Sequence, residues 1–306
     1  MAGAPGWHQY AGGSPSSVER ALLAQVSGFD LARNAHNTDF RFYHGRTDTG
    51  PMRPHYVEEF EALLQRKNIP YKNRWYDAGH DILYIVERRE KLFEDLTRVV
   101  RNPHPAQIKM VTSDFRANRQ HWLEVTRFDG YPALAEIDGK IEDSTLSIKS
   151  KGASALRIYA QDLPLSPNRE LKLQINGEAV FEGKRDALGH RVNVVHQNGK
   201  WRLAYPETST LEKKPGLSGP LTDGYYEPAV HVYGSQNEST RSLLEQSATK
   251  AARGWPLWLW FFSQPVVADS ELSEAQIKNN NIVLYGTPDD NIVLKDRFQA
   301  TDPDHT

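Results

Sequence analysis

Residues 42–82, with the sequence FYHGRTDTGPMRPHYVEEFEALLQRKNIPYKNRWYDAGHDI, decide the fold of the first part of the chain. The start of this stretch belongs to a short predicted strand over residues 39–43. Apolar residues then recur at helical spacing over residues 54–67, which predicts an amphipathic helix. An extended segment follows over residues 69–76. The pattern is therefore strand, helix and strand.

Two polar residues follow these predicted strands at their carboxyl ends. Asp48 lies in the turn after the first strand, and His80 lies in the turn after the second. The three elements form one βαβ-like unit, and open α/β sheets place their chemistry at the carboxyl edge of their strands. Asp48 and His80 are therefore the first candidate site residues.

The stretch resembles the last part of an α/β-hydrolase domain of the prolyl-oligopeptidase (S9) type. In that family an HGxxD turn supplies the acid of a Ser-Asp-His triad, and a Gly-His turn supplies the base. The resemblance implies that Asp48 is the acid and His80 the base. A carboxylate in that position orients the imidazole, selects its tautomer and stabilises the imidazolium. His44 and Arg46 are candidates for substrate binding, although a turn residue and a surface arginine are their plainer interpretations.

The chain departs from that family where the nucleophile should be. α/β-Hydrolases carry their serine on a Gly-x-Ser-x-Gly elbow that precedes the acid, and the chain has no such pentapeptide. Ser14 and Ser16, in AGGSPSS at residues 11–17, are the nearest upstream candidates for a nucleophile. Residues 1–38 are too few for the strands that the family needs there. We therefore expect a hydrolase unit that is truncated at its N-terminus.

The composition is ordinary for a soluble globular protein, with 25% charged and 39% hydrophobic residues. A net charge of −2 gives no electrostatic support for a nucleic-acid partner. Cysteine is absent and no HExxH motif is present, so we expect no disulfide, metal or cofactor. The first residues lack the pattern of a signal peptide. The longest apolar run, residues 255–262, is too short for membrane insertion, which takes roughly 20 residues, and predicts a buried strand or core segment.

Changes in pattern divide the chain into four parts, and the predicted fold class is α/β plus all-β. We expect a lead-in over residues 1–38 with one helix at 17–26, and a partial α/β-hydrolase unit over residues 39–105. A β-sandwich is predicted over residues 106–205, followed by a small C-terminal α/β domain over residues 206–306.

Local signals within these parts predict further elements. Apolar spacing after His80 predicts one long helix that ends before Asn102-Pro103. Short alternating strands with frequent turns are typical of a sandwich. Three pairs, Asp138-Gly139, Asn176-Gly177 and Asn198-Gly199, indicate two-residue hairpin turns, because such turns need positive φ at both positions.

The last part returns to α/β alternation, with strands at residues 230–233 and 282–285 and a helix at 237–253. The segments KKPGLSGPLTDGYYEPAVHVYGS and NNNIVLYGTPDDNIVL also resemble the C-terminal region of large bacterial S9-like hydrolases. Both strands exit through Tyr-Gly-Ser or Tyr-Gly-Thr, which either binds an anion through backbone amides or simply makes a tight turn. A nucleotide-binding module is the weaker interpretation, because no GxGxxG or P-loop follows a predicted strand.

The leading hypothesis is a hydrolase, an esterase or S9-like peptidase, that acts on a small ester or peptide substrate. His80 activates water directly, or a serine such as Ser14 or Ser16 enters the site, or another chain completes it. A truncated sheet exposes a pairing edge, which favours a homo-oligomer. The alternative is a catalytically inactive binding or scaffold module derived from an S9-type hydrolase.

Overall fold

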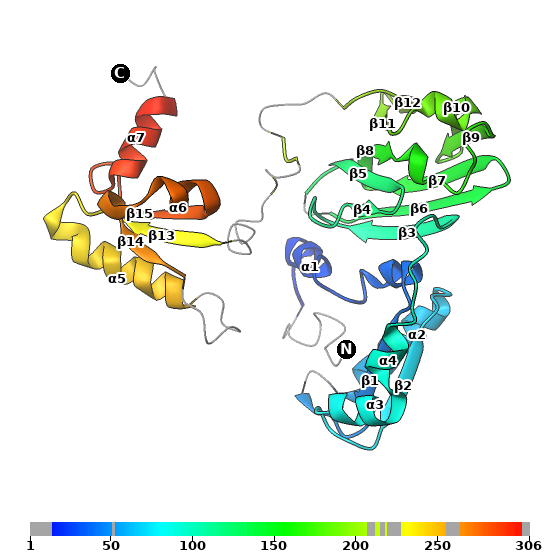
Figure 1. Ribbon diagram of the computed structural model, residues 1–306, viewed down its shortest axis with the longest axis horizontal. Coiled ribbons are helices and arrows are strands. Elements are labelled where there is room, and N and C mark those ends of the chain that lie inside the picture. The colour runs from blue at the N-terminus through cyan, green and yellow to red at the C-terminus, as the bar shows by residue number, and fades with distance from the viewer. Residues whose placement is uncertain are drawn as a thin grey trace. The chain divides into compact units, whose positions relative to one another are not determined.

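The fold of the chain is mixed α/β with several sheets (Figure 1). The computed structural model describes residues 14–50, 53–131, 133–206, 212–214, 218, 228–254 and 264–301. The chain divides into two compact units, Met1–Ser218 and Gly219–Thr306. The apolar segment predicted at residues 255–262 lies outside the described residues.

The first unit begins with helices and a parallel strand pair. Ser16 caps the first helix in a reciprocal capping box with Glu19, which explains why the predicted helix starts there. Strands β1 and β2 pair in parallel, with Phe42 opposite Asn73. The elements of this part are α1 (Ser17–Ala24), η2 (Ala32–Asn37), β1 (Arg41–Gly45), α2 (Pro54–Arg66), β2 (Lys72–Tyr76), α3 (Leu83–Glu90) and α4 (Leu92–Leu96).

The two faces of the β1–β2 pair are covered by different apolar layers. On one face Phe42 packs with Phe60 and Leu64 of α2. On the other face Tyr76 packs with Val86 of α3. A pair of strands alone is marginally stable in water, so these two layers supply most of the stability of this part.

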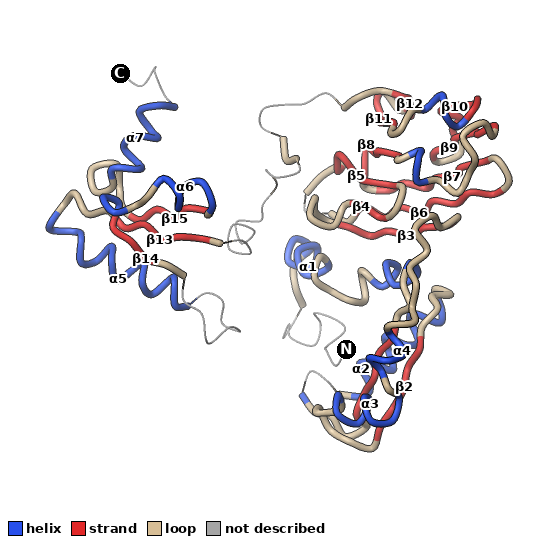
Figure 2. The backbone as a smooth tube through the Cα atoms, viewed as in Figure 1, coloured by secondary structure: helices blue, strands red, loops and turns tan. Residues whose placement is uncertain are grey.

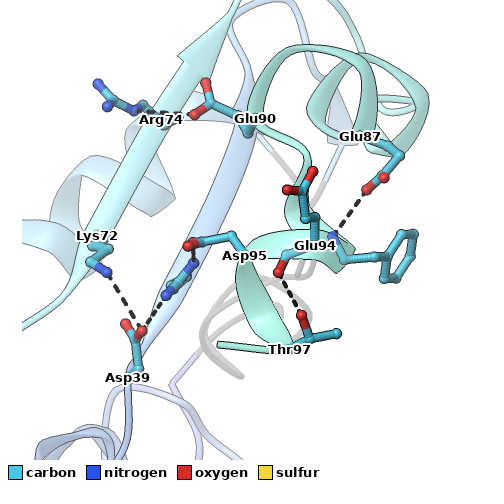
Figure 3. A network of polar contacts seen from close by, with 10 residues as sticks. Asp39, Lys72, Arg74, Glu87, Glu90, Glu94, Asp95 and Thr97 are labelled. Carbon is cyan, nitrogen blue, oxygen red and sulfur yellow. Dashed lines mark hydrogen bonds and ion pairs between the residues drawn. The ribbon is translucent and has the colours of Figure 1, made fainter. Parts of the chain in front are cut away.

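The single long helix predicted after His80 is wrong, because two short helices occupy that segment. Lys91 has a φ of 49°, a left-handed conformation that ends α3. The side chain of Glu87 then accepts a hydrogen bond from the backbone N–H of Phe93 at 3.2 Å, at the start of α4 (Figure 3). The apolar spacing continues across the break, but Phe93 and Leu96 are exposed while Val86 on α3 is buried.

Ion pairs fasten α4 to the start of β1 (Figure 3). The Arg41 guanidinium contacts the carboxylates of Asp39 and of Asp95 in α4. Lys72 Nζ lies 3.5 Å from the same Asp39 carboxylate. Hydrogen bonds from Arg41 are the main cause that lowers the pKa of Asp39.

Over the described residues from 107 to 203, ten strands form two five-stranded sheets. Their orders are β10-β9-β7-β6-β3 and β12-β11-β8-β5-β4, and all pairs are antiparallel except β7–β9. The sheets share one core, in which Leu146 and Leu173 of the first sheet and Leu123 and Leu156 of the second are fully buried. The elements are β3 (Gln107–Thr112), β4 (Arg119–Gln120), β5 (Leu123–Phe128), β6 (Ala135–Glu142), β7 (Thr145–Lys151), β8 (Ala153–Ile158), η4 (Ala160–Asp162), β9 (Glu170–Ile175), β10 (Glu178–Lys184), η5 (Arg185–Leu188), β11 (Val192–Gln197) and β12 (Lys200–Leu203).

Two of the three predicted hairpin turns are confirmed. Asn176-Gly177 joins β9 to β10 with φ values of 51° and 85°, and Asn198-Gly199 joins β11 to β12 with φ values of 52° and 74°. Asp138-Gly139 lies instead in the middle of β6, and the turn to β7 follows at Asp143-Ser144. A Cβ atom at Gly139 would lie 2.4 Å from the ring of Trp122. Gly139 is therefore required by packing against Trp122 and not by a turn.

The second unit alternates strands and helices (Figure 2). Its parallel three-stranded sheet has the order β14-β13-β15. Helix α5 lies along one face of that sheet, where its Ala248 packs with Tyr233 and Ala268 (Figure 1). The elements are β13 (Ala229–Tyr233), α5 (Glu238–Gly254), β14 (Val266–Ala268), η7 (Asp269–Glu271), α6 (Glu274–Asn279), β15 (Asn281–Tyr285) and α7 (Ile292–Thr301).

Candidate functional site

The turns after β1 and β2 are joined through their backbones. The Arg46 N–H donates to the Tyr76 carbonyl at 2.8 Å, and the Thr47 N–H donates to the Ala78 carbonyl at 3.1 Å. This close approach depends on Gly45, because a Cβ atom there would lie 2.2 Å from the carbonyl oxygen of Ala78. The glycine of the HGxxD motif is therefore needed for the two turns to lie this close together.

The joined turns bring Asp48 and His80 together. Nδ1 of His80 lies 3.1 Å from Oδ2 of Asp48. The Asp48 side chain is only 4% exposed, whereas the His80 side chain is 61% exposed. Oδ1 of Asp48 accepts the Thr49 N–H at 2.8 Å, which fixes the carboxylate. The pair thus has a buried, oriented acid and an imidazole that is open to solvent.

His44 and Arg46 flank this pair in different environments. His44 is buried, with 2% exposure, and its Nδ1 has no hydrogen-bond partner among the described residues. This burial argues against the predicted substrate contact of His44. The Arg46 side chain is 59% exposed, lies 3.5 Å from Asp77 and stacks over Trp75 at 5.8 Å from the ring centre. Arg46 therefore remains accessible in the turn that also carries Asp48.

The burial of His44 predicts a loss of stability on acidification. Burial is the main cause that lowers its pKa, and the nearby Asp48 carboxylate acts in the opposite direction. The folded state then binds fewer protons than the unfolded state, so stability falls as pH drops below about 6.5, the ordinary value for histidine. Thermal unfolding at about pH 7.5 and about pH 5 should show a smaller fall in Tm for His44→Gln than for the wild type. Burial also lowers the pKa values of His36 and His121. Both histidines are present in the wild type and in His44→Gln, so they do not contribute to the difference between the two proteins. Equal losses of Tm would contradict this role of His44.

The structure does not join either candidate serine to the pair within the described residues. Ser16 Oγ accepts the Glu19 N–H at 3.3 Å as the cap of α1, so its hydroxyl is already engaged. Ser14 is exposed just before that cap. Ser235 follows β13 and precedes α5, but its φ is not positive, unlike that of a strained nucleophile elbow. Its hydroxyl donates to Asp269.

In the second unit, the backbone N–H groups that follow β13 and β15 donate hydrogen bonds to carboxylates of the same unit. Oδ1 of Asp269 accepts the Ser235 N–H at 3.0 Å, and Oδ2 of Asp290 accepts the Thr287 N–H at 2.9 Å. Hydrogen bonds, first from the Thr240 hydroxyl and then from Thr287, lower the pKa of Asp290 to about 2. Of the two interpretations of these strand exits, the bonds support the plainer one, tight turns, over an anion site. Asp269 and Asp290 follow their strands directly or closely in sequence, which is the signal that could have identified them.

In the part of the chain that the structure describes, no three histidine or acidic residues gather as a metal site would need. No helix within those same ranges is both long and apolar enough to traverse a bilayer.

Comparisons with protein-family models, with curated proteins and with solved structures find no match to the chain.

Proposed function

We propose that the protein hydrolyses an ester or amide bond at the Asp48–His80 pair. In this proposal residues 39–105 form a partial α/β-hydrolase-like unit, residues 106–205 a β-sandwich and residues 206–306 a small α/β domain. One observation carries it, the 3.1 Å contact between a buried Asp48 carboxylate and Nδ1 of an exposed His80. A structural ion pair on the surface does not need this division between a buried acid and an open base.

The geometry supports a general-base role for His80. In the tautomer that carries its proton on Nδ1, His80 donates a hydrogen bond to Asp48, and the free lone pair is on Nε2 of the exposed ring. Asp48 holds the ring orientation and stabilises the imidazolium that forms when Nε2 takes a proton. General-base catalysis of this kind contributes about 10²–10⁴-fold to a rate.

Three sources of the attacking group are compatible with this pair. Water activated by His80 needs no further residue but forgoes a covalent intermediate. A serine is the second source, and Ser14 remains a candidate because no helix cap engages it. A second copy of the chain is the third. Within the described residues β1 pairs only with β2, which supports a pairing edge for a homo-oligomer.

Arg46 suggests a preference among small ester and peptide substrates. Its guanidinium is exposed and follows β1 two residues before Asp48, and its ion-pair partner Asp77 is itself 95% exposed. An exposed ion pair is worth little, so a substrate carboxylate can replace Asp77 at small cost. We therefore propose that substrates with an anionic group near the scissile bond are hydrolysed faster than neutral ones.

The proposal is tested by hydrolysis of a panel of nitrophenyl esters and short peptides. Asp48→Asn should reduce kcat/KM by at least about 10²-fold, because the amide no longer stabilises the imidazolium or fixes its tautomer. Asp129→Asn serves as the matched control, since it makes the same change at an exposed carboxylate that has no role in the proposed site. Equal activity of the wild type and Asp48→Asn, or none in either, would exclude a catalytic role for the pair.

The rival proposal is a catalytically inactive binding or scaffold module. It is supported by the lack of a serine bonded to His80 among the described residues, and by the use of Ser16 in a helix cap. A fluorophosphonate probe, which reacts with activated serines, separates the two proposals when combined with the activity panel. Hydrolysis without labelling supports activated water, labelling supports a serine, and neither signal supports the scaffold.

A further inference from the structure

Strand β3 forms the outer edge of the first five-stranded sheet, next to β6. Alternate residues of this edge turn their backbone groups toward β6, beginning with Ala106 directly before β3, whose carbonyl accepts the Ile141 N–H. The backbone groups of Lys109 and Val111 point the other way, because neighbouring residues of a strand bond on opposite sides. Open groups of this kind form a template for another strand.

Two asparagine side chains of η2 form hydrogen bonds with those backbone groups. Oδ1 of Asn34 accepts the Val111 N–H at 2.7 Å, and its Nδ2 donates to the Val111 carbonyl at 2.8 Å. Oδ1 of Asn37 accepts the Lys109 N–H at 3.0 Å, and its Nδ2 donates to the Lys109 carbonyl. Each side-chain amide thus makes the pair of bonds that a residue of a neighbouring strand would make.

The spacing of the two asparagines fits the strand. Residues three apart in a 3₁₀-helix lie on the same side, about 6 Å apart along the axis at roughly 2.0 Å per residue. Residues two apart in an antiparallel strand repeat at about 6.8 Å. Asn34 meets Val111 and Asn37 meets Lys109, so the sequence direction of η2 is antiparallel to that of β3. A short 3₁₀-helix therefore reproduces the bonding pattern of an edge strand.

The neighbouring residues of η2 fix it between two layers. Arg33 forms ion pairs with Glu136 and Asp138 of β6. Ala32, on the same helix, is buried with Phe60 in the apolar layer between α2 and β1. The segment predicted as a lead-in to the α/β part therefore also contacts the sheet.

We propose that η2 is a strand surrogate, in which Asn34 and Asn37 close the edge of β3. This closure holds the α/β part of the first unit to the sheet and blocks strand addition by a second copy of the chain. The inference is independent of the proposed hydrolase activity.

Amide hydrogen exchange resolved at single residues tests the proposal. In the wild type, the N–H groups of Lys109 and Val111 should exchange as slowly as those of Ile108 and Met110. Asn34→Ala should speed exchange at Val111 by about ten-fold and leave Lys109 slow, whereas Asn37→Ala should do the reverse. Asn279→Ala is the matched control, because the side chain of that asparagine donates to the Ala275 carbonyl of its own helix in the second unit.

The double variant Asn34→Ala, Asn37→Ala tests the block against a second copy. Its mass by light scattering should rise above that of the wild type as concentration increases, while the Leu173 amide in the core stays protected. Fast exchange at Lys109 and Val111 in the wild type would overturn the closure, and this measurement does not depend on any variant folding. A wild-type mass for a double variant whose two amides exchange freely would overturn the block.

Discussion

Replacing Gly45 by alanine should lower the free energy of unfolding of the first unit by about 3 kcal/mol or more. The added Cβ would lie 2.2 Å from the carbonyl oxygens of both Ala78 and Gly79 and 2.9 Å from the Ala78 carbonyl carbon. All three are backbone atoms, so no side chain can rotate away to make room. The turn after β2 must move instead, and that movement strains the two backbone hydrogen bonds that join the turns.

Gly79→Ala provides the matched control for this change. Gly79 belongs to the same pair of turns, but a Cβ atom there would meet nothing within 4 Å, and its φ lies outside the left-handed range. Its effect should stay within about 0.5 kcal/mol. Urea unfolding of both variants measures the difference, and equal effects would show that the close approach of the two turns does not limit stability. Gly45→Ala should also separate Asp48 from His80, because each residue belongs to one of the turns.

His80→Ala should reduce kcat/KM for the best substrate of the panel by about 10²–10⁴-fold, the usual range for loss of a general base. The free energy of unfolding should change by less than about 1 kcal/mol, because the His80 side chain is mostly exposed and water can replace it as a partner of Asp48.

His190→Ala is the control for the loss of an imidazole. His190 is exposed and bonds to Gln161 within the sheet region, and its replacement should leave kcat/KM within about two-fold. Activity that survives in His80→Ala would contradict the general-base role. Both His80→Ala and Asp48→Asn should lower kcat/KM. Their effects should not add in the double variant, because the two residues act as a unit.

Elements that depend on neighbours in the sequence were predictable. The apolar spacing of residues 54–67 predicted α2, which spans Pro54–Arg66. The pairs Asn176-Gly177 and Asn198-Gly199 predicted their hairpins, because only a few residue types adopt positive φ at low cost. The strand, helix and strand of residues 42–82 likewise placed Asp48 and His80 in the turns that the structure brings together. In each case the deciding interactions are local.

Other features depend on partners that are distant in the sequence. Gly139 was predicted in a turn, but Trp122 requires a residue without a side chain inside β6. The predicted helix after His80 breaks at Lys91, although its apolar spacing continues. The burial of His44 follows from the packing of the turns around it, which spacing alone does not reveal.

By itself, the sequence determined the local elements and the two polar turns, because backbone preference and hydrophobic period act over a few residues. Only the tertiary structure decided that Asn34 and Asn37 complete the edge of β3, more than seventy residues away in the chain. It also decided which turn glycine tolerates a side chain, since a Cβ atom at Gly45 would meet backbone atoms and one at Gly79 would meet nothing within 4 Å. Contacts between distant segments set these features, and no short-range pattern in the sequence encodes them.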